Sequence, residues 1–484
     1  MLSQETLITK NSGVQKKSPG KVLGVFSLVM INVIAVDNLR SLTAGAEYGF
    51  ALVFFYLLAA LLFFIPSILV SAELATGWPT TGGVYVWVRE AFGQRFGFLT
   101  IWLQWIYNVV WYPTIFTFIA GIFAYLISPS LANNKIFMLT VILSSYWGLT
   151  LLNCLGLKVS NLMSTLGAIL GTIFPMILIA FLGFAWIYSG KHSQIQFTLH
   201  DFFPNLTHLN NLAFLTNILF GLMGMEMSAV HAGDVKNPER NYPRALFIST
   251  VIILATLVFA CLAITIVVPG KELNLVSGLM DAFGIFFTAY HMNWFIPVIA
   301  VLIILGSLSG AAVWIIGPTR GLLVASQEGD LPRFLKKRNK KNMPVGILLT
   351  QGLIVTVLCT VFLIMPSVNS SYWVLSNLTA QLALLFYILM FAAAICLRYK
   401  HTHVKRAFKI PGGLVGIWLV SGVGILTCIG AIILGFLPPT QVAIGRVATY
   451  ETILIVGIIV CCLPPFILYA KNFVFRRSLF QQSG

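Results

Sequence analysis

The residues best suited to chemistry in this sequence lie inside long apolar runs, where charged groups are rare. Residues 217–243 place Gly221, Gly224 and the carboxylate of Glu226 deep in one such run. A glycine weakens a helix by about 1 kcal/mol relative to alanine, and a carboxylate near the bilayer centre is costlier unless it is paired or protonated. The pattern predicts a broken membrane helix whose free backbone groups, starting at Phe220, line a small-molecule site. Close helix packing at the glycines, with Glu226 as a hydrogen-bonded plug, is an equally good interpretation.

Residues 20–50 repeat this anomaly near the amino terminus. The polar residues at membrane depth include Asp37, Asn38 and Arg40. At about 1.5 Å per residue, a helix from Lys21 passes the middle of the membrane near residue 35. The predicted break therefore lies at Ile34, Ala35 and Val36. Direct contact of Asp37 and Arg40 with substrate competes with a slightly favoured alternative, in which the two side chains form an i, i+3 ion pair on the helix surface.

The elements that must position these residues follow from composition. The 484 residues are 58% hydrophobic and only 9% charged, which excludes a soluble protein of this size. Twelve apolar runs have the length of a membrane span. They cover roughly residues 21–46, 50–75, 97–127, 136–155, 160–188, 211–232, 243–268, 290–322, 345–366, 372–397, 413–437 and 452–471.

The net charge of +16 follows the topology of the chain rather than indicating a nucleic-acid partner. Basic residues gather in the loops on the side of the amino terminus, and the opposite side carries few. Those few are Lys135, Lys191, Lys271 and Arg446. The positive-inside rule therefore places both termini in the cytoplasm, with residues 1–20 and 472–484 as cytoplasmic tails.

The two anomalous spans are the first and the sixth, so they have opposite orientations. Two interrupted helices in corresponding positions of oppositely oriented halves indicate an inverted-repeat secondary transporter. Residues 21–410 would form the ten-helix core, with helices 11 and 12 in residues 411–471. The fold class expected is an all-α membrane protein with twelve transmembrane helices and a 5+5 inverted repeat.

Other polar residues allow two interpretations each. In the third span Asn108 and Tyr112 could line a pocket or belong to an aromatic interface belt. Glu73 is most simply a solvated charge at a helix end, and the small residues at 307–310 favour close helix packing. The histidines of residues 189–210 match no usual zinc spacing. His231 and Asp234 are most simply solvated, with pH sensing as a weaker alternative. The seven cysteines are expected to be buried free thiols. No cofactor is expected.

Four motifs together resemble the amino acid, polyamine and organocation transporter superfamily. They are GWPTTGGVYVWVREAFG (77–93), FGLMGMEMSAVHAGDVKNPERNYPRAL (220–246), GPTRGLLVASQEGDLP (317–332) and KRAFKIPGG (405–413). WIIGPTRG (314–321) and KRAFKIPGG look most like its bacterial glutamate/GABA antiporter family. The resemblance implies the leucine-transporter fold, location in the inner membrane, and amino acid uptake or exchange without ATP.

The resemblance also implies roles for individual residues. The substrate carboxylate would be held by N–H groups of Ile34, Ala35 and Val36, and the ammonium by carbonyls of both breaks, including Phe220 and Gly221. Phe220 would gate the site, and Glu226 would have a proton-linked or conformational role. The usual glycine-rich first break is replaced here by Ile34-Ala35-Val36, followed by Asp37, Asn38 and Arg40.

The leading hypothesis is a secondary amino acid carrier, with proton symport as the alternative to exchange. Arg40, about one turn beyond the break, would favour a substrate with an acidic side chain if it faces the pocket. If it pairs with Asp37 or Glu226 instead, it indicates nothing about the substrate. A transport-impaired sensor would need an added soluble domain, and a membrane enzyme would need a nucleophile–base pair of recognisable spacing. Neither feature is visible in the sequence, which leaves the substrate, the coupling ion and a homodimer open.

Overall fold

The computed structural model describes residues 23–79, 82–156, 166–204, 209–227, 235–325 and 331–482. Nearly all of these residues are helical, and the one β contact among them is a bridge between Leu23 and Val235. Ten helices are long and apolar enough to cross a membrane, and a broken pair, Val25–Val36 with Leu39–Ala46, passes the same test. The shorter apolar helix Leu215–Met227 occupies the sixth predicted run. Each of the twelve predicted runs therefore corresponds to helical structure.

The helices of the first five runs are α1 (Val25–Val36) with α2 (Leu42–Ala46), α3 (Leu52–Ala59) with α4 (Ile65–Gly77), α6 (Gln94–Ile127), α7 (Lys135–Cys154) and α9 (Phe174–Tyr188). Those of the remaining runs are α11 (Leu215–Gly221), α12 (Pro238–Val267), α14 (Ile296–Ala325), α15 (Val345–Leu358) with α16 (Val361–Ile364), α17 (Val368–Lys400), α18 (Gly413–Gly435) and α19 (Val447–Gln482). Helices α5 (Val84–Phe92), α10 (Leu199–Phe202) and α13 (Gly278–Ala289) lie between runs. The short 3₁₀ and π segments are η1 (Leu39–Ser41), η2 (Gly49–Ala51), η3 (Ala60–Phe64), η4 (Pro129–Asn133), η5 (Ile169–Ile173), η6 (Leu209–Leu212), η8 (Gly270–Glu272) and η9 (Asn293–Phe295).

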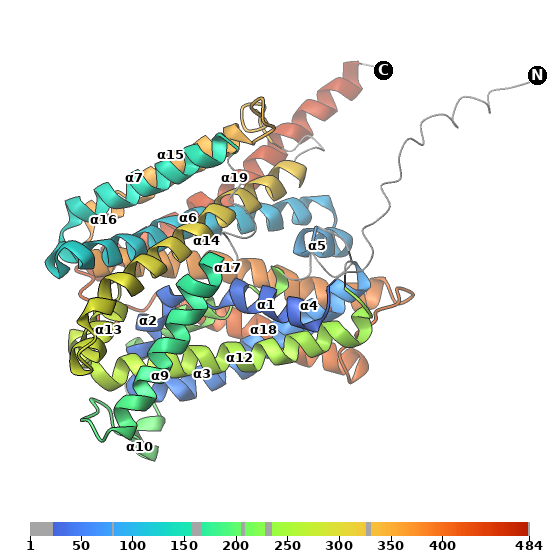
Figure 1. The fold of residues 1–484 in the computed structure, drawn as a ribbon. Coiled ribbons are helices and arrows are strands. Elements are labelled where there is room, and N and C mark those ends of the chain that lie inside the picture. Colours follow the sequence, from blue (N-terminus) through green and yellow to red (C-terminus); the bar gives the residue numbers. More distant parts are fainter. Residues whose placement is uncertain are drawn as a thin grey trace, which may run out of the picture.

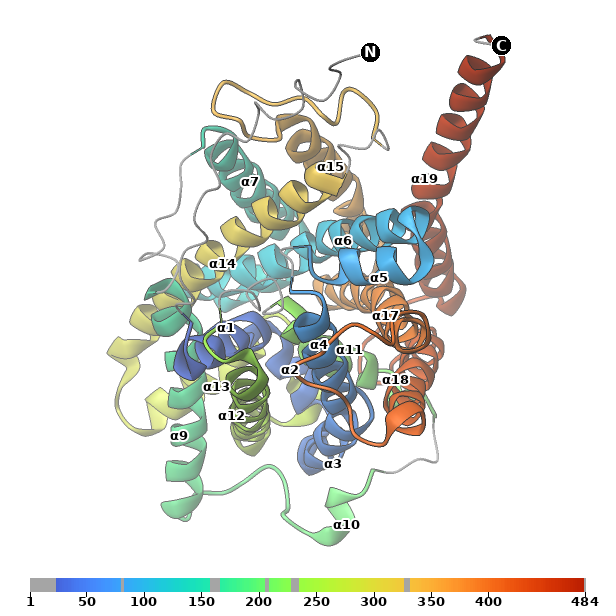
Figure 2. The same cartoon turned by 90° about the vertical axis from the view of Figure 1, so that its right-hand side faces the viewer.

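The helices pack in two groups that face each other. Helices α6, α7, α14 and α15 contact one another, as do α1 to α4 with α11 and α12. Figures 1 and 2 show these groups in the upper and lower halves of the view. Helix α17 contacts members of both groups, and α9 with its leading π segment η5 contacts α12 and α14. A site between the groups is therefore bounded by two linking helices.

Large apolar side chains cover the outer surface of the bundle. Helix α18 exposes 76% of Val415 and 70% of Leu426, and α12 exposes 71% of Phe247. Such a surface is costly in water and compatible with lipid. Helix α5 and the end of α19 lie at one end of the molecule, whereas α10 and α13 lie at the other (Figure 1). The lipid-facing helices thus run between two ends at which the connecting helices lie.

The first break lies one to three residues later than the sequence indicated. Helix α1 continues through Val36, and the chain is extended at Asp37 and Asn38 before η1 begins. The two halves are bent by 44°. The position is set by Asn38, whose side-chain oxygen accepts a hydrogen bond from Ser41 N over 3.0 Å and so caps the second half. Residues 34–36 are apolar and remain in the last turn of α1.

The second break follows α11 and uses glycine. Helix α11 ends at Gly221, and Gly224 has φ of +123°, a conformation that side chains rarely adopt. The N–H of Gly224 donates to the Tyr387 hydroxyl of α17 over 2.9 Å. This break lies within the predicted interval from Phe220 to Gly224. Residues 228–234, which include His231 and Asp234, lie outside the described residues.

Glu73 is a correction to the sequence-based expectation, because it is buried rather than solvated. Only 1% of it is exposed. Its carboxylate accepts hydrogen bonds from both Nε and Nη2 of Arg398, lies 3.3 Å from Nε of Arg406, and accepts from Ile410 N over 2.9 Å. A buried carboxylate is tolerated when it is paired in this way. The cluster ties the ends of α4 and α17 to the segment before α18.

Candidate functional site

A cavity of about 330 Å³ lies between the two helix groups. One side is formed by residues 34–40 of the first break, together with Phe220, Met223, Gly224 and Glu226. The other side is formed by residues of α6 and α14, and Ala168 and Thr172 close it from the fifth span. The volume falls at the lower end of the range for small-molecule sites. Both breaks therefore face one enclosure, as the sequence predicted.

Arg40 carries an unpaired charge into this cavity. Only 3% of the residue is exposed, and among the described residues it forms no ion pair. Its Nη1 donates long hydrogen bonds of 3.4 Å to the hydroxyls of Tyr372 and Ser376, and its Nε has no hydrogen-bond partner. The guanidinium lies 5.1 Å from the centroid of the Phe220 ring. The buried charge of Arg40 is therefore not balanced by a carboxylate among the described residues.

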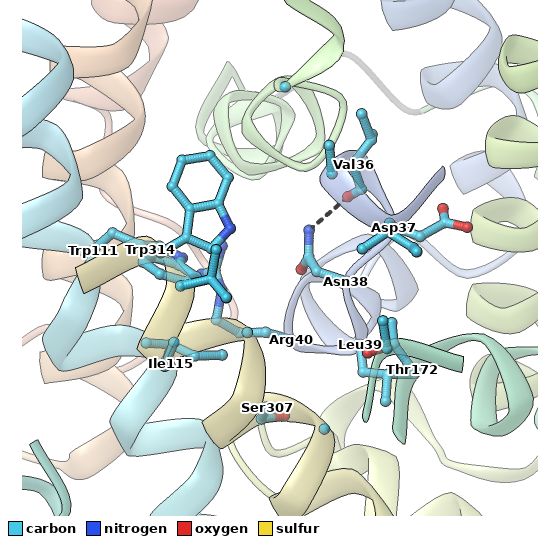
Figure 3. Close-up of a pocket in the computed structure, with 18 of the residues that line it drawn as sticks. Val36, Asp37, Asn38, Leu39, Arg40, Trp111, Ile115, Thr172, Ser307 and Trp314 are labelled. Atoms are coloured by element: carbon cyan, nitrogen blue, oxygen red, sulfur yellow. Dashed lines mark hydrogen bonds between the residues drawn. The ribbon is translucent and has the colours of Figure 1, made fainter. Parts of the chain in front are cut away.

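Asp37 does not neutralise Arg40. The Asp37 carboxylate is directed away from the cavity, whereas Arg40 extends toward Trp314 and Ile115 (Figure 3). Thr256 of α12 is the hydrogen-bond partner of the carboxylate, with Oγ1 at 3.1 and 3.2 Å from its two oxygens. The i, i+3 ion pair is therefore absent. The pair does not form because the backbone is extended at residues 37 and 38, and an i, i+3 pair needs continuous helix between its members.

Glu226 has a partner of its own. Its Oε2 accepts a short hydrogen bond from the Tyr387 hydroxyl, and the same hydroxyl accepts from Gly224 N. Glu226 is 4% exposed and contributes to the cavity. This hydrogen bond connects the second break to α17. The first break is connected to the same helix by Tyr372, whose hydroxyl donates to the carbonyl of Arg40 over 3.1 Å. Glu226 is thus both a cavity residue and a hydrogen-bonded plug.

Ten of the twelve predicted site residues line the cavity. They are Ile34, Ala35, Val36, Asp37, Asn38, Arg40, Asn108, Phe220, Gly224 and Glu226. Residues 34–36 lie in the last turn of α1, where N–H groups bond within the helix and carbonyls are left without intrahelical partners. Of these carbonyls, that of Val36 accepts a hydrogen bond from Asn38 Nδ2 over 3.2 Å (Figure 3).

Tyr112 and Gly221 do not line the cavity. Tyr112 is fully buried behind it and donates its hydroxyl to the carbonyl of Trp314 over 2.8 Å. Helical geometry explains the difference, because a residue next to Trp111 points about 100° away around α6. Gly221 lies within α11 and faces Ser41.

Several cavity residues were not assigned to the site from the sequence. On α6 these are Tyr107, Trp111, Ile115 and Phe118. The last three follow Asn108 at helical spacing and could have been found by that periodicity. On α14 they are Gly306, Ser307, Ser309, Gly310, Ala311, Val313 and Trp314. The expected close packing occurs at Ser309, since a Cβ on Gly167 would lie 2.9 Å from its Cβ, but not at Gly310, where a Cβ would meet nothing within 4 Å. The seven cysteines are free, and no group of residues suited to a metal ion occurs in the described part of the chain.

Residues 21–460 match the amino acid permease family. The chain belongs to this family. The permease is 56% identical over 452 residues to an uncharacterized transporter of Legionella pneumophila, covering 93% of this chain and 97% of the relative. It is 32% identical over 454 residues to a glutamate/gamma-aminobutyrate antiporter of Lactococcus lactis, covering 93% and 90%. These findings confirm the predicted superfamily and the relationship to glutamate/GABA antiporters.

The fold of the permease is also found in a solved structure. MhsT in complex with L-phenylalanine superposes with a TM-score of 0.57 at 15% identity, covering 86% of this chain and 100% of that chain. Together with the apolar spans and the broken first helix, this likeness confirms the predicted leucine-transporter fold. The permease is a multi-pass plasma-membrane protein of an amino acid transport family.

Proposed function

We propose that this permease is an antiporter that exchanges an acidic amino acid for another amino acid or for its decarboxylation product. The observation that carries the proposal is the unpaired guanidinium of Arg40 in the cavity. A substrate carboxylate would supply the missing charge and accept the unused N–H groups in a planar, bidentate arrangement. The relative from Lactococcus lactis, whose name gives glutamate and gamma-aminobutyrate, supports the same class of substrate.

The rest of the cavity suits an α-amino group and an alkyl chain. Carbonyls at the end of α1 face the second break, where the carbonyl of Ala35 approaches within 3.0 Å of the position of a Cβ on Gly224. Such carbonyls accept from an ammonium group. Trp111 and Trp314, with ring centroids 6.2 Å apart, provide an apolar surface on the facing side.

Phe220, beside Arg40, would act as the gating aromatic. Both termini of the permease would lie in the cytoplasm.

Counterflow in proteoliposomes tests the exchange. Vesicles containing the full-length protein are preloaded with glutamate, gamma-aminobutyrate, arginine or leucine, and uptake of labelled glutamate is measured with and without a pH gradient. Uptake that requires internal glutamate or gamma-aminobutyrate is expected for an antiporter. Uptake into empty vesicles that follows the pH gradient would instead identify a proton symporter, and the absence of uptake of any amino acid would contradict transport.

Arg40→Ala tests the recognition of the carboxylate. Removing one member of a buried charged pair costs about 2–5 kcal/mol, so the KM for glutamate is expected to rise at least 30-fold. Leucine uptake, where measurable, should change much less because leucine has no second carboxylate. Arg446→Ala is the matched control, since Arg446 is exposed and lies outside the cavity. An unchanged KM for glutamate in Arg40→Ala would refute this role.

A further inference from the structure

The carboxylate of Asp37 is a buried acid that substrate recognition does not use. Asp37 is 4% exposed and forms part of the cavity wall, but its carboxylate points away from Arg40 and Trp314 (Figure 3). It is directed toward α12, where Thr256 Oγ1 is its hydrogen-bond partner. An ionised carboxylate in such a place is costly unless a cation compensates it.

No cation compensates Asp37 within the part of the chain that the structure describes. It forms no ion pair there, and the nearby charge of Arg40 is turned toward the hydroxyls of α17. Near Asp37, the packed helices carry the phenol of Tyr56 on α3 and the thiol of Cys261 on α12, which lie 3.5 Å apart in a hydrogen bond of their own. The basic residues of α12, Arg240 and Arg244, lie about three or more helical turns before Thr256. Glu226, the remaining acid of the centre, faces Tyr387.

Thr256 is the hydrogen-bond partner of the Asp37 carboxylate, and its hydroxyl is shared with other acceptors. Its Oγ1 lies 2.9 Å from the carbonyl of Ile252 and 3.0 Å from that of Ile253, as well as near both oxygens of Asp37. A hydroxyl has one hydrogen, and in a helix it commonly donates it to a carbonyl of the preceding turn. The same hydrogen can be donated to the oxygens of Asp37 at 3.2 and 3.1 Å, so it is shared among four acceptors. An ionised Asp37 would therefore be left in the membrane with at most a shared hydrogen bond and no cation, a cost that the neutral acid avoids.

Two more polar contacts join α1 and α2 to α12, the helix that carries Thr256. Asn32 donates to Ser249 Oγ over 3.1 Å, and Cys261 Sγ donates to the carbonyl of Leu42 over 3.3 Å. These contacts lie on either side of the Asp37–Thr256 pair along α12. Asp37 is the one acid among these three contacts. Separation of α1 and α2 from α12 would expose its carboxyl to water and favour the ionised form.

We propose that Asp37 is a proton-binding site, occupied while the first broken helix is packed against α12 and emptied when the two separate. The proton leaves a carboxyl oxygen for water and a carboxylate remains, so one proton is bound and released per movement. The occupancy rests on the burial of Asp37, on its lack of an ion pair within the described residues, and on the single hydrogen that Thr256 can share with it. The link between that movement and transport rests on the proposed function.

Infrared difference spectroscopy tests the occupancy independently of transport. Spectra of the purified full-length protein at neutral pH are compared with those of Asp37→Asn, which cannot hold the proton. The C=O stretch of a protonated carboxyl should be present in the wild type and lost in Asp37→Asn, but retained at the Asp37 frequency in Glu226→Gln. A wild-type minus Asp37→Asn spectrum with carboxylate bands and no carboxyl band would overturn the proposal.

Thr256→Val provides a second test if Asp37→Asn fails to fold. It removes the acceptor of the proton and keeps the acid, so the carboxyl band is expected to shift in frequency. A band identical to that of the wild type would overturn the assignment of Thr256 as the acceptor, and with it the proposal.

Transport measurements test the coupling. The ratio of glutamate uptake with and without a pH gradient should exceed one in the wild type and fall to one in Asp37→Asn, whatever the basal rate. An unchanged ratio in Asp37→Asn would overturn the coupling role. A protein that shows the carboxyl band but exchanges no amino acid would refute the proposed function while leaving the proton site intact.

Discussion

The two breaks face the same cavity but are built from different chemistry. The first contains no glycine and is stabilised by an Asn38 side chain that caps the helix beyond it. The second depends on Gly224 and its positive φ. Backbone conformation at the first break is thus available to ordinary residues, whereas the second requires glycine. The first break is therefore free to carry functional side chains.

The two breaks also differ in how their charged side chains, Asp37, Arg40 and Glu226, are placed. At the first break, Asp37 and Arg40 diverge, one toward α12 and one into the cavity (Figure 3). At the second break, Glu226 accepts a hydrogen bond from the Tyr387 hydroxyl. Helix α17 holds both breaks through tyrosine hydroxyls, Tyr372 at the first and Tyr387 at the second. We infer that the first break selects the charge of the ligand and the second fixes the geometry of the site.

The largest effect is expected for Gly224→Ala. An alanine at φ of +123° is strained, and its Cβ would lie 3.0 Å from the carbonyl oxygen of Ala35, directly across the two breaks. Strain of this kind costs about 1–3 kcal/mol before the contact is counted. Counterflow should fall below detection and the thermal unfolding midpoint should drop.

The control for this prediction is Gly430→Ala on α18, where a Cβ would meet nothing within 4 Å. That variant should match the wild type in both measurements. Wild-type counterflow in Gly224→Ala would show that the second break does not need glycine and would remove the contrast between the breaks.

Tyr387→Phe should have the next largest effect. It removes the hydroxyl that accepts from Gly224 N and donates to Glu226, which leaves two buried polar groups without this partner. A loss of one or two kcal/mol corresponds to a 5- to 30-fold change, expected here in the exchange rate. Because the residues act together, Glu226→Gln in the Tyr387→Phe background should add little. Fully additive effects in this double-mutant cycle would contradict a shared role.

The presence of both breaks could be predicted because the signals are local. Glycines and ionisable residues within apolar runs are improbable in a plain lipid-facing helix. The position of the first break could not be read in the same way. Ile34, Ala35 and Val36 are compatible with continued helix. Asn38 caps the segment beyond the break, but an asparagine alone does not fix a helix end, and the contact of the adjacent Asp37 with Thr256 is 219 residues away in sequence.

The same limit applies to side-chain environments. Glu73 reads as a helix-end charge because its partners, Arg398 and Arg406, are more than 300 residues distant in the chain. The face of α6 that lines the cavity follows from helical spacing after Asn108, yet the sequence does not show which face α14 covers. Tyr112 was therefore assigned to the cavity although it supports Trp314 from behind.

Tyr372→Phe should have a moderate effect confined to the first break. The hydroxyl donates to the carbonyl of Arg40 and accepts a long bond from its Nη1, so it orients the guanidinium without contacting the ligand. A typical hydrogen bond contributes about 0.5–1.5 kcal/mol, which predicts a 2- to 10-fold higher KM for glutamate with little change in kcat. Tyr399→Phe, on the same helix and 53% exposed, is the control. An equal loss in kcat would indicate a general structural role instead.

Gly221→Ala should have the smallest effect, although it lies three residues from Gly224. Gly221 ends α11 with ordinary helical backbone, and a Cβ there would lie 3.2 Å from Ser41 Oγ, a side chain that can rotate. Alanine also favours a helix by up to about 1 kcal/mol, which offsets the tighter contact. Counterflow and the unfolding midpoint are expected to stay near wild-type values. A loss as large as that of Gly224→Ala would show that the second break extends into α11, and that close packing against the first break, rather than the conformation of one glycine, holds the cavity open.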